Sequence, residues 1–135
     1  MVSTKQPSAP DTGLSLEVIG TTGRKACEIA ADARSLAAKV RDGQITPPEL
    51  SGATFTVSNL GIFGVRYFDA VIPQAGILAI GEIAERPAMR NGEIVAAQLM
   101  NLTLSCDHRI LCGAEGAEFL AAVRGLLEEP IALAL

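Results

Sequence analysis

The chain has 135 residues, of which 49% are hydrophobic and 19% are charged, and its formal net charge is −4. This length is typical of one domain, and the apolar fraction is high enough for a buried core, which excludes a disordered chain. Acidic and basic residues are mixed along the sequence without a basic cluster, so we expect neither nucleic acid nor a membrane as a partner. No segment approaches the roughly 20 apolar residues of a membrane span, and no apolar run follows Lys5. We therefore expect a soluble, cytoplasmic protein.

The three cysteines, Cys27, Cys106 and Cys112, form no C-x-x-C pair. An odd number of cysteines without such a pair argues against a disulfide framework and against a zinc site, so we expect reduced thiols and no metal. Cys27 lies on the apolar stripe of an expected helix, and Cys106 alternates with leucines in an expected strand. We interpret both as small packed hydrophobic residues.

The N-terminal third of the chain predicts a tail, a strand and a helix. Residues 1–10 are polar with two prolines and predict a flexible tail or the remnant of a linker, which leaves 11–135 as the domain. Residues 14–19 favour a short strand. Between Arg24 and Arg41 apolar residues recur at i, i+3 and i+4, which predicts an amphipathic helix that ends at Gly43.

The middle of the chain predicts a short capped turn and two strands. Thr46-Pro47-Pro48-Glu49 has the pattern of a capping box with proline at the first helical position. Residues 53–58 alternate, and the threonine and serine face predicts a solvated surface. The apolar run of residues 76–84 predicts a buried strand.

The C-terminal half predicts a hairpin, a long strand and a second helix. Asn91-Gly92 is typical of a type I′ turn, here joining residues 86–89 to one long strand from Glu93 toward Asp107. Residues 114–128 carry a wide apolar face and predict a helix that ends before Pro130.

The single histidine of the chain, His108, lies at the predicted end of that long strand. Even-numbered residues of the strand share one face, so the imidazole continues a row of apolar side chains. A histidine at a strand end beside Gly113 is a candidate general base, because imidazole titrates near neutral pH. From spacing alone, a structural histidine is the slightly favoured interpretation. A second strand end, Thr56-Val57-Ser58-Asn59-Leu60-Gly61, offers a hydroxyl at another glycine junction.

Together these two segments resemble the catalytic domain of the dihydrolipoyl acyltransferases of 2-oxo acid dehydrogenase complexes, which is related to chloramphenicol acetyltransferase. The Asp-His-Arg-x-x-Asp-Gly motif of that family reads here as residues 107–113, and its Thr-x-Ser-Asn-Leu-Gly segment is intact at residues 56–61. The resemblance extends over residues 11–135 and implies an α/β fold, with helices packed on one face of a mixed β-sheet. It also implies that the chain is an N-terminally truncated, C-terminal portion of the domain.

The resemblance implies acyl transfer between dihydrolipoamide and coenzyme A without a metal and without a covalent acyl-enzyme, the lipoyl group being carried on another chain. It assigns His108 as the general base and Ser58 as the hydrogen-bond donor to the tetrahedral intermediate. Asp107 and Arg109 are interpreted as an ion pair that shapes the loop, since an arginine stays protonated and is no base. For the segment of residues 56–61, the alternative interpretation is structural: Ser58 caps its turn and Asn59 forms an Asx-turn.

Cys112 departs from the family, which carries aspartate or asparagine at this position to fix the histidine loop. A thiol is a poorer acceptor and forms no ion pair, so reduced or lost activity is a second interpretation. A third is a nucleophile activated by His108. We disfavour it because side chains at i and i+4 are neighbours on a helix but not across a strand-to-turn junction.

The resemblance further implies a homotrimer, or a multiple of it, whose active sites lie between subunits, so that His108 and Ser58 come from adjacent chains. A lipoyl domain and other subunits of a 2-oxo acid dehydrogenase complex are the expected partners. Apolar faces that the chain does not bury alone should be covered by oligomerisation. The alternative function is a catalytically weak or inactive assembly module of the same fold.

Overall fold

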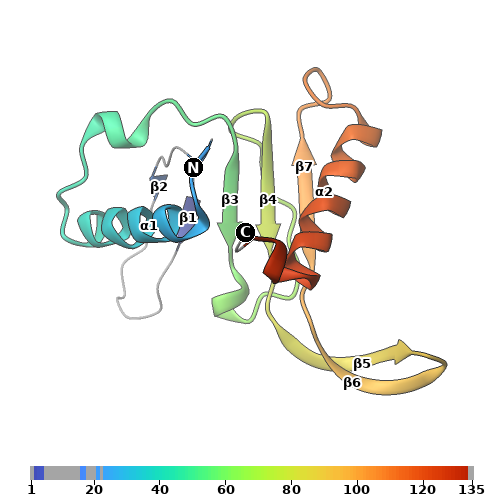
Figure 1. Cartoon of the computed structure of the whole chain (residues 1–135). Helices are drawn as coiled ribbons and strands as arrows, with labels where there is room; N and C mark the ends of the chain where they lie inside the picture. The colour runs from blue at the N-terminus through green and yellow to red at the C-terminus, as the bar shows by residue number, and fades with distance from the viewer. Residues whose placement is uncertain (1, 5–15, 18–20, 22, 134–135) are drawn as a thin grey trace.

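The computed structural model describes residues 2–4, 16–17, 21 and 23–133, and within these it contains a mixed five-stranded sheet (Figure 1). The strand order is β2-β1-β3-β4-β7. β1, β3 and β4 are parallel, whereas β2 and β7 are antiparallel to their neighbours. The strands are β1 (Val2–Thr4), β2 (Leu16–Glu17), β3 (Thr56–Asn59), β4 (Gly76–Ile80) and β7 (Leu102–Cys106). The predicted fold class, a mixed sheet with packed helices, is confirmed.

The N-terminal strand β1 falls within the segment for which the sequence predicts a tail. Its residues pair in parallel with β3, at Val2–Val57, Ser3–Ser58 and Thr4–Asn59. β1 thereby satisfies the free edge of β3, which would otherwise expose unpaired N–H and C=O groups. Residues 5–10 lie outside the described residues, as do residues 14, 15, 18 and 19 of the strand predicted over 14–19.

The core is centred on β4, the strand between β3 and β7. Ile77, Leu78 and Ala79 are the buried hydrophobic residues of the described chain. On β3, Thr56 is 2% exposed and donates from Oγ1 to Oε1 of Gln74 at 2.6 Å. The polar face of this strand was expected to be solvated, and at Thr56 this is wrong, because Gln74 supplies the partner that water would otherwise provide.

The first helix, α1 (Ala26–Arg41), forms as predicted and is followed by Gly43 with φ of 67°. The capped turn at Pro47–Leu50 is also confirmed, with Glu49 accepting from both N and Oγ1 of Thr46. No residue of α1 is buried, and Cys27 is exposed. The prediction that Cys27 packs as a hydrophobic residue is therefore wrong in this chain, because α1 packs mainly against the edge strand β2.

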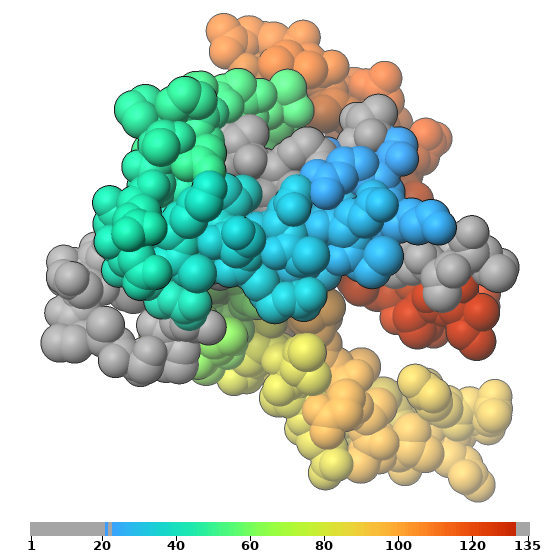
Figure 2. Space-filling model, turned by 60° about the vertical axis from the view of Figure 1, so that its left-hand side comes forward, coloured from blue at the N-terminus to red at the C-terminus, as the bar shows by residue number. Residues whose placement is uncertain are grey.

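The hairpin of β5 (Ala84–Arg90) and β6 (Glu93–Leu99) turns at Asn91 and Gly92, which have φ of 52° and 83°. These positive angles confirm the type I′ turn, whose two central residues both require φ above zero. The hairpin forms a sheet of its own and projects from the body of the chain (Figure 2).

The single long strand predicted from Glu93 toward Asp107 is wrong, because the chain bends between β6 and β7. At the bend, the backbone carbonyl of Asn101 accepts from the Gly81 N–H at 2.9 Å. The side-chain Nδ2 of Asn101 donates to the Arg66 carbonyl at 3.2 Å. The buried run of residues 76–84 is likewise divided, since β4 ends at Ile80 and β5 begins at Ala84. A Cβ at Gly81 would overlap the Arg66 carbonyl, so the close approach at this junction requires glycine.

The second helix, α2 (Gly113–Glu128), matches its prediction to within one residue and packs along β7 (Figure 1). The rings of Phe119 on this helix and Phe55 lie with centroids 5.5 Å apart. A short 3-10 turn, Pro130–Leu133, follows the helix.

Large apolar side chains of the described residues remain exposed on several elements, as the sequence analysis expected. The clearest are Val71, which is 92% exposed, and Ile131, which is 78% exposed. Three more, Phe119, Leu126 and Leu127, lie on α2. Oligomerisation, which would cover such side chains, stays our prediction.

Candidate active site

His108 lies on a turn that begins directly after β7. The N–H of Asp107 donates to the Ala75 carbonyl at 3.0 Å and extends the pairing of β7 by one residue. The chain then reverses, since the N–H groups of Ile110 and Leu111 both donate to the Asp107 carbonyl. His108 is exposed on this turn. The prediction that it lies at a strand terminus is confirmed, although its backbone belongs to the turn and not to the strand.

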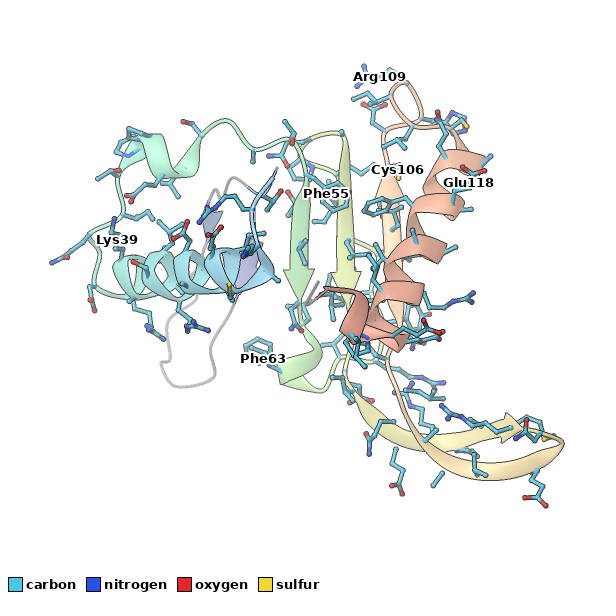
Figure 3. The ribbon with its side chains drawn as sticks, in the orientation of Figure 1. Lys39, Phe55, Phe63, Cys106, Arg109 and Glu118 are labelled. Carbon is cyan, nitrogen blue, oxygen red and sulfur yellow. The ribbon has the colours of Figure 1, made fainter. Side chains whose placement is uncertain are left out.

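Asp107 and Arg109 form the ion pair that the sequence analysis expected. Nε of Arg109 donates to Oδ1 at 2.9 Å, its Nη2 donates to Oδ2 at 2.6 Å, and its backbone N–H donates to Oδ1 at 3.0 Å. These hydrogen bonds lower the pKa of Asp107 to about 2, and the bonds from the Arg109 side chain have the largest effect. Arg109 is at the outer end of the turn and its side chain is 89% exposed (Figure 3). Both residues therefore shape the turn that carries His108.

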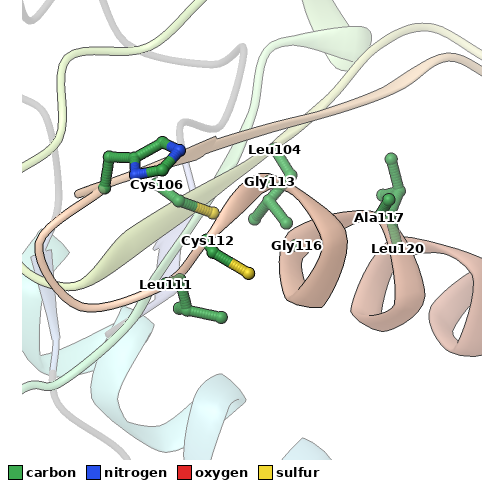
Figure 4. A pocket seen from close by; sticks show the side chains of 9 residues that line it. Leu104, Cys106, Leu111, Cys112, Gly113, Gly116, Ala117 and Leu120 are labelled. Atoms are coloured by element: carbon green, nitrogen blue, oxygen red, sulfur yellow. The ribbon is translucent and has the colours of Figure 1, made fainter.

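His108 lines a pocket of about 260 Å³ between β7 and α2 (Figure 4). The wall is otherwise formed by leucines, glycines, an alanine and two cysteines: Leu104, Cys106, Leu111, Cys112, Gly113, Gly116, Ala117 and Leu120. Leu104, Cys106 and His108 line it together, which confirms that the imidazole continues the even-numbered face of the strand. An imidazole at the edge of a mainly apolar, open pocket can reach a substrate while its ring borders a partly dry space.

Cys112 is the N-cap residue of α2, with φ of −76° and ψ of 163°. Its backbone N–H donates to Oε2 of Glu115 at 2.8 Å, and this hydrogen bond is the main cause that lowers the pKa of Glu115. Sequence reasoning missed Glu115, although a polar residue followed three positions later by glutamate is the capping-box pattern. The position at which the family carries aspartate or asparagine is thus the helix cap, where those two residues are favoured.

Gly116, unlike Gly113, is packed against β7. Gly113 is the first residue of α2, and a Cβ there would meet no atom within 4 Å. Gly116 is buried, and its Cβ would lie 3.5 Å from Sγ of Cys106. Cys106 is thus packed against α2, as expected from the sequence, and a Cβ on Gly116 would make only ordinary van der Waals contact with it.

Ser58 and Asn59 end β3 at the other end of the sheet. Oδ1 of Asn59 accepts from the Gly61 N–H at 2.9 Å, which confirms the Asx-turn considered for it. The Ser58 hydroxyl makes no hydrogen bond with the described part of the chain, so the capping interpretation of Ser58 gains no support there.

Ser58 and His108 are not brought together within one chain. Ser58 on β3 pairs with Ala79 on β4, and Ala79 pairs with Thr103 on β7. Because β7 runs opposite to β3 and β4, three further residues of β7, or about 10 Å, separate the level of Ser58 from Cys106. His108 lies beyond Cys106, whereas Ser58 faces the opposite end of the sheet.

Among the described residues, no group of three or more histidine, cysteine, aspartate or glutamate side chains is arranged to hold a metal ion. The helices of the described chain are also too short or too polar to cross a membrane.

Residues 8–135 match the model of the family described as 2-oxoacid dehydrogenases acyltransferase (catalytic domain). The chain belongs to this family. Similar curated proteins are the dihydrolipoyllysine-residue acetyltransferase components of pyruvate dehydrogenase complex from Rickettsia conorii, 38% identical over 126 residues, and Staphylococcus epidermidis, 43% identical over 123 residues. These matches cover 91% and 89% of this chain but 31% and 28% of the relatives. The chain therefore spans about a third of the length of the curated relatives that it matches.

Solved structures of the family have the same fold. The probable dihydrolipoamide acetyltransferase of Listeria monocytogenes superposes with a TM-score of 0.85 at 34% identity, over 95% of this chain and 54% of that one. The dihydrolipoamide acetyltransferase of Azotobacter vinelandii superposes with a TM-score of 0.76 at 30% identity, over 84% and 47%. The latter structure addressed the role of a serine, a histidine and an asparagine in the catalytic mechanism of that enzyme. The predicted family and fold are thereby confirmed.

Proposed function

We propose that this chain moves an acyl group between dihydrolipoamide and coenzyme A, as part of a 2-oxo acid dehydrogenase complex. The observation that carries the proposal is the position of His108, whose ring lines an open apolar pocket at the end of β7 in a chain of this family. Both carriers of the acyl group are thiols, of which one enters as the thioester and the other as the free thiol, and the lipoyl group arrives on another chain.

In the proposed reaction, His108 takes the proton from the incoming thiol, whose ordinary pKa is about 8.5. The resulting thiolate attacks the thioester carbon. The oxyanion that forms needs a hydrogen-bond donor, and Ser58 is the donor that we propose. Asp107 and Arg109 support the reaction only by holding the turn that carries the base.

We further propose that each site is shared by two chains of a homo-oligomer, one supplying His108 and the next supplying Ser58. The support is the separation of the two residues along the sheet of one chain, which exceeds hydrogen-bond reach. The exposed apolar side chains provide a second argument, because an oligomer interface would cover them. A trimer is the smallest assembly that the family resemblance implies.

A mixing experiment tests the catalytic residues and the shared site together. We expect His108→Ala to abolish acyl exchange between acetyl-CoA and free dihydrolipoamide, and Ser58→Ala to lower its rate by roughly 10² to 10³. If equal amounts of the two variants are unfolded, mixed and refolded, about a quarter of the shared sites regain both intact residues. Recovered activity of that order supports the proposal, whereas a mixture no more active than its components excludes a shared site.

The second candidate function is a catalytically weak assembly module. The observation that favours it is Cys112, because a thiol at the cap of α2 replaces the aspartate or asparagine of the family motif. The same assay separates the two functions. An oligomer that forms but shows no exchange above the His108→Ala background supports the assembly module.

A further inference from the structure

The wall of the pocket contains three groups that can exchange protons or act as nucleophiles: the imidazole of His108 and the thiols of Cys106 and Cys112. The proposed function uses only the imidazole. The two thiols share the space that a thioester would enter, and they have the same chemistry as the two thiol substrates. The inference below rests on the proposed function.

The two thiols differ in how they are held. Cys106 is partly buried, and its Sγ is packed toward Gly116, whose Cβ would lie only 3.5 Å away. Cys112 is exposed, and it lines the pocket where α2 begins (Figure 4). Its backbone N–H donates to the carboxylate of Glu115 at 2.8 Å, and its thiol also hydrogen-bonds with that carboxylate, so both the backbone and the side chain of Cys112 are held at the start of α2. Cys112 is therefore the thiol that a substrate can reach.

The turn explains how Cys112 and His108 come to line one pocket although they are four residues apart. Both Ile110 and Leu111 donate their N–H groups to the Asp107 carbonyl, so the chain folds back on itself immediately after the histidine. An open strand-to-turn junction, as expected from the sequence, would have kept His108 and Cys112 apart. The tight turn instead lets both residues line the same pocket.

We propose that Cys112 is an acyl acceptor, forming a thioester with the acyl group of acyl-CoA in the pocket of His108. In this step Sγ of Cys112 forms a bond to the carbonyl carbon, and the bond from that carbon to the sulfur of coenzyme A breaks. The proton of the Cys112 thiol passes to His108 and from there to the departing thiolate. One thioester replaces another, so the step requires no oxidant or reductant.

Acylation of Cys112 would reversibly inhibit the enzyme by filling its own pocket. Exchange between two alkyl thioesters is close to thermoneutral, so the occupancy of Cys112 follows the ratio of acyl-CoA to free coenzyme A. An acyl group on Cys112 occupies the pocket beside His108 until a free thiol removes it. The aspartate or asparagine of the family motif offers no sulfur for this reaction.

Mass spectrometry of the full chain tests the proposal. The chain is incubated with excess acetyl-CoA at neutral pH, digested, and each cysteine peptide is examined. We expect one acetyl group on Cys112 that is released by free coenzyme A or dihydrolipoamide. Cys27 is the internal control, because it is also exposed but lies on α1 away from the pocket. His108→Ala should acetylate Cys112 roughly 10²-fold more slowly, the usual contribution of a general base.

The outcomes separate this inference from the proposed function. Equal labelling of Cys112 and Cys27 overturns the inference, and so does labelling that His108→Ala does not slow. No label on Cys112 in a chain that exchanges acyl groups with dihydrolipoamide overturns the inference and leaves the proposed function intact. A label without such exchange supports the inference and contradicts the function. Since the comparison of Cys112 with Cys27 needs no variant, it decides the matter even if His108→Ala fails to fold.

Discussion

Replacing Cys112 by aspartate restores a strong N-cap to α2 and should stabilise the chain. The residue has the extended conformation of an N-cap and is followed three positions later by Glu115. A carboxylate there is a stronger acceptor than the thiol for the N–H groups of the first turn, and it complements the positive end of the helix dipole. The cost of burying an unpaired carboxylate, which would reverse the sign, does not apply, because Cys112 is exposed.

The expected gain over the weakly capping thiol is at most about 1 kcal/mol, the value typical of the difference between a strong N-cap and an uncapped residue. Repulsion between the new carboxylate and Glu115 opposes it by a few tenths of a kcal/mol at an exposed helix end. For a chain of this size, 1 kcal/mol raises the melting temperature by roughly 3–4 °C. Turnover should rise as well, because a firmer start of α2 holds the turn and the His108 ring in one position.

Thermal unfolding of the natural chain is compared with Cys112→Asp, Cys112→Ser and Cys112→Ala at pH 7. We expect aspartate to be the most stable and alanine the least, with serine, a cap without charge, between aspartate and alanine. Below pH 4 the aspartate advantage should shrink toward that of serine, as the carboxylate is protonated. An aspartate variant both less stable and less active than the alanine variant would refute the capping argument.

Three further predictions concern acid, glycine packing and assembly. The folded pKa of Asp107, about 2, lies below its ordinary value of 3.8, so its stabilising effect is present above pH 4 and is lost between pH 4 and 2. An acid titration of Asp107→Asn should therefore show a weaker loss of stability in that window, and an unchanged curve would contradict the ion pair. Gly116→Ala should stabilise α2 by about 0.5–1 kcal/mol because its Cβ would make only ordinary contacts, whereas Gly61→Ala should destabilise because its Cβ would overlap the backbone of Gly81. Urea unfolding measures the stability of both variants. Equal effects of the same sign would be evidence against the close approach of Gly61 to the backbone of Gly81. A chain ending at Glu129 loses the exposed Ile131 and should form smaller assemblies in light scattering, whereas identical masses would remove this segment from the interface.

The sequence by itself determined the helices, the hairpin turn and the residues of the candidate site. Periodicity located α1 and α2 to within two residues, because a helix with one apolar stripe imposes a local repeat. The Asn91-Gly92 pair specified its turn for a similarly local reason, since both residues tolerate positive φ. The role of Asp107 and Arg109 was also readable, as the two residues are near in sequence and opposite in charge.

Only the tertiary structure decided where the long strand divides, which glycine is needed and how the site residues are distributed. The bend between β6 and β7 depends on bonds from Asn101 to Gly81 and Arg66, which are distant in sequence and leave no periodic signal. The opposite directions of β3 and β7 separate Ser58 from His108, while the tight turn after Asp107 brings His108 and Cys112 to one pocket. These features depend on pairing and packing between distant segments, whereas sequence patterns report the conformation of each segment alone.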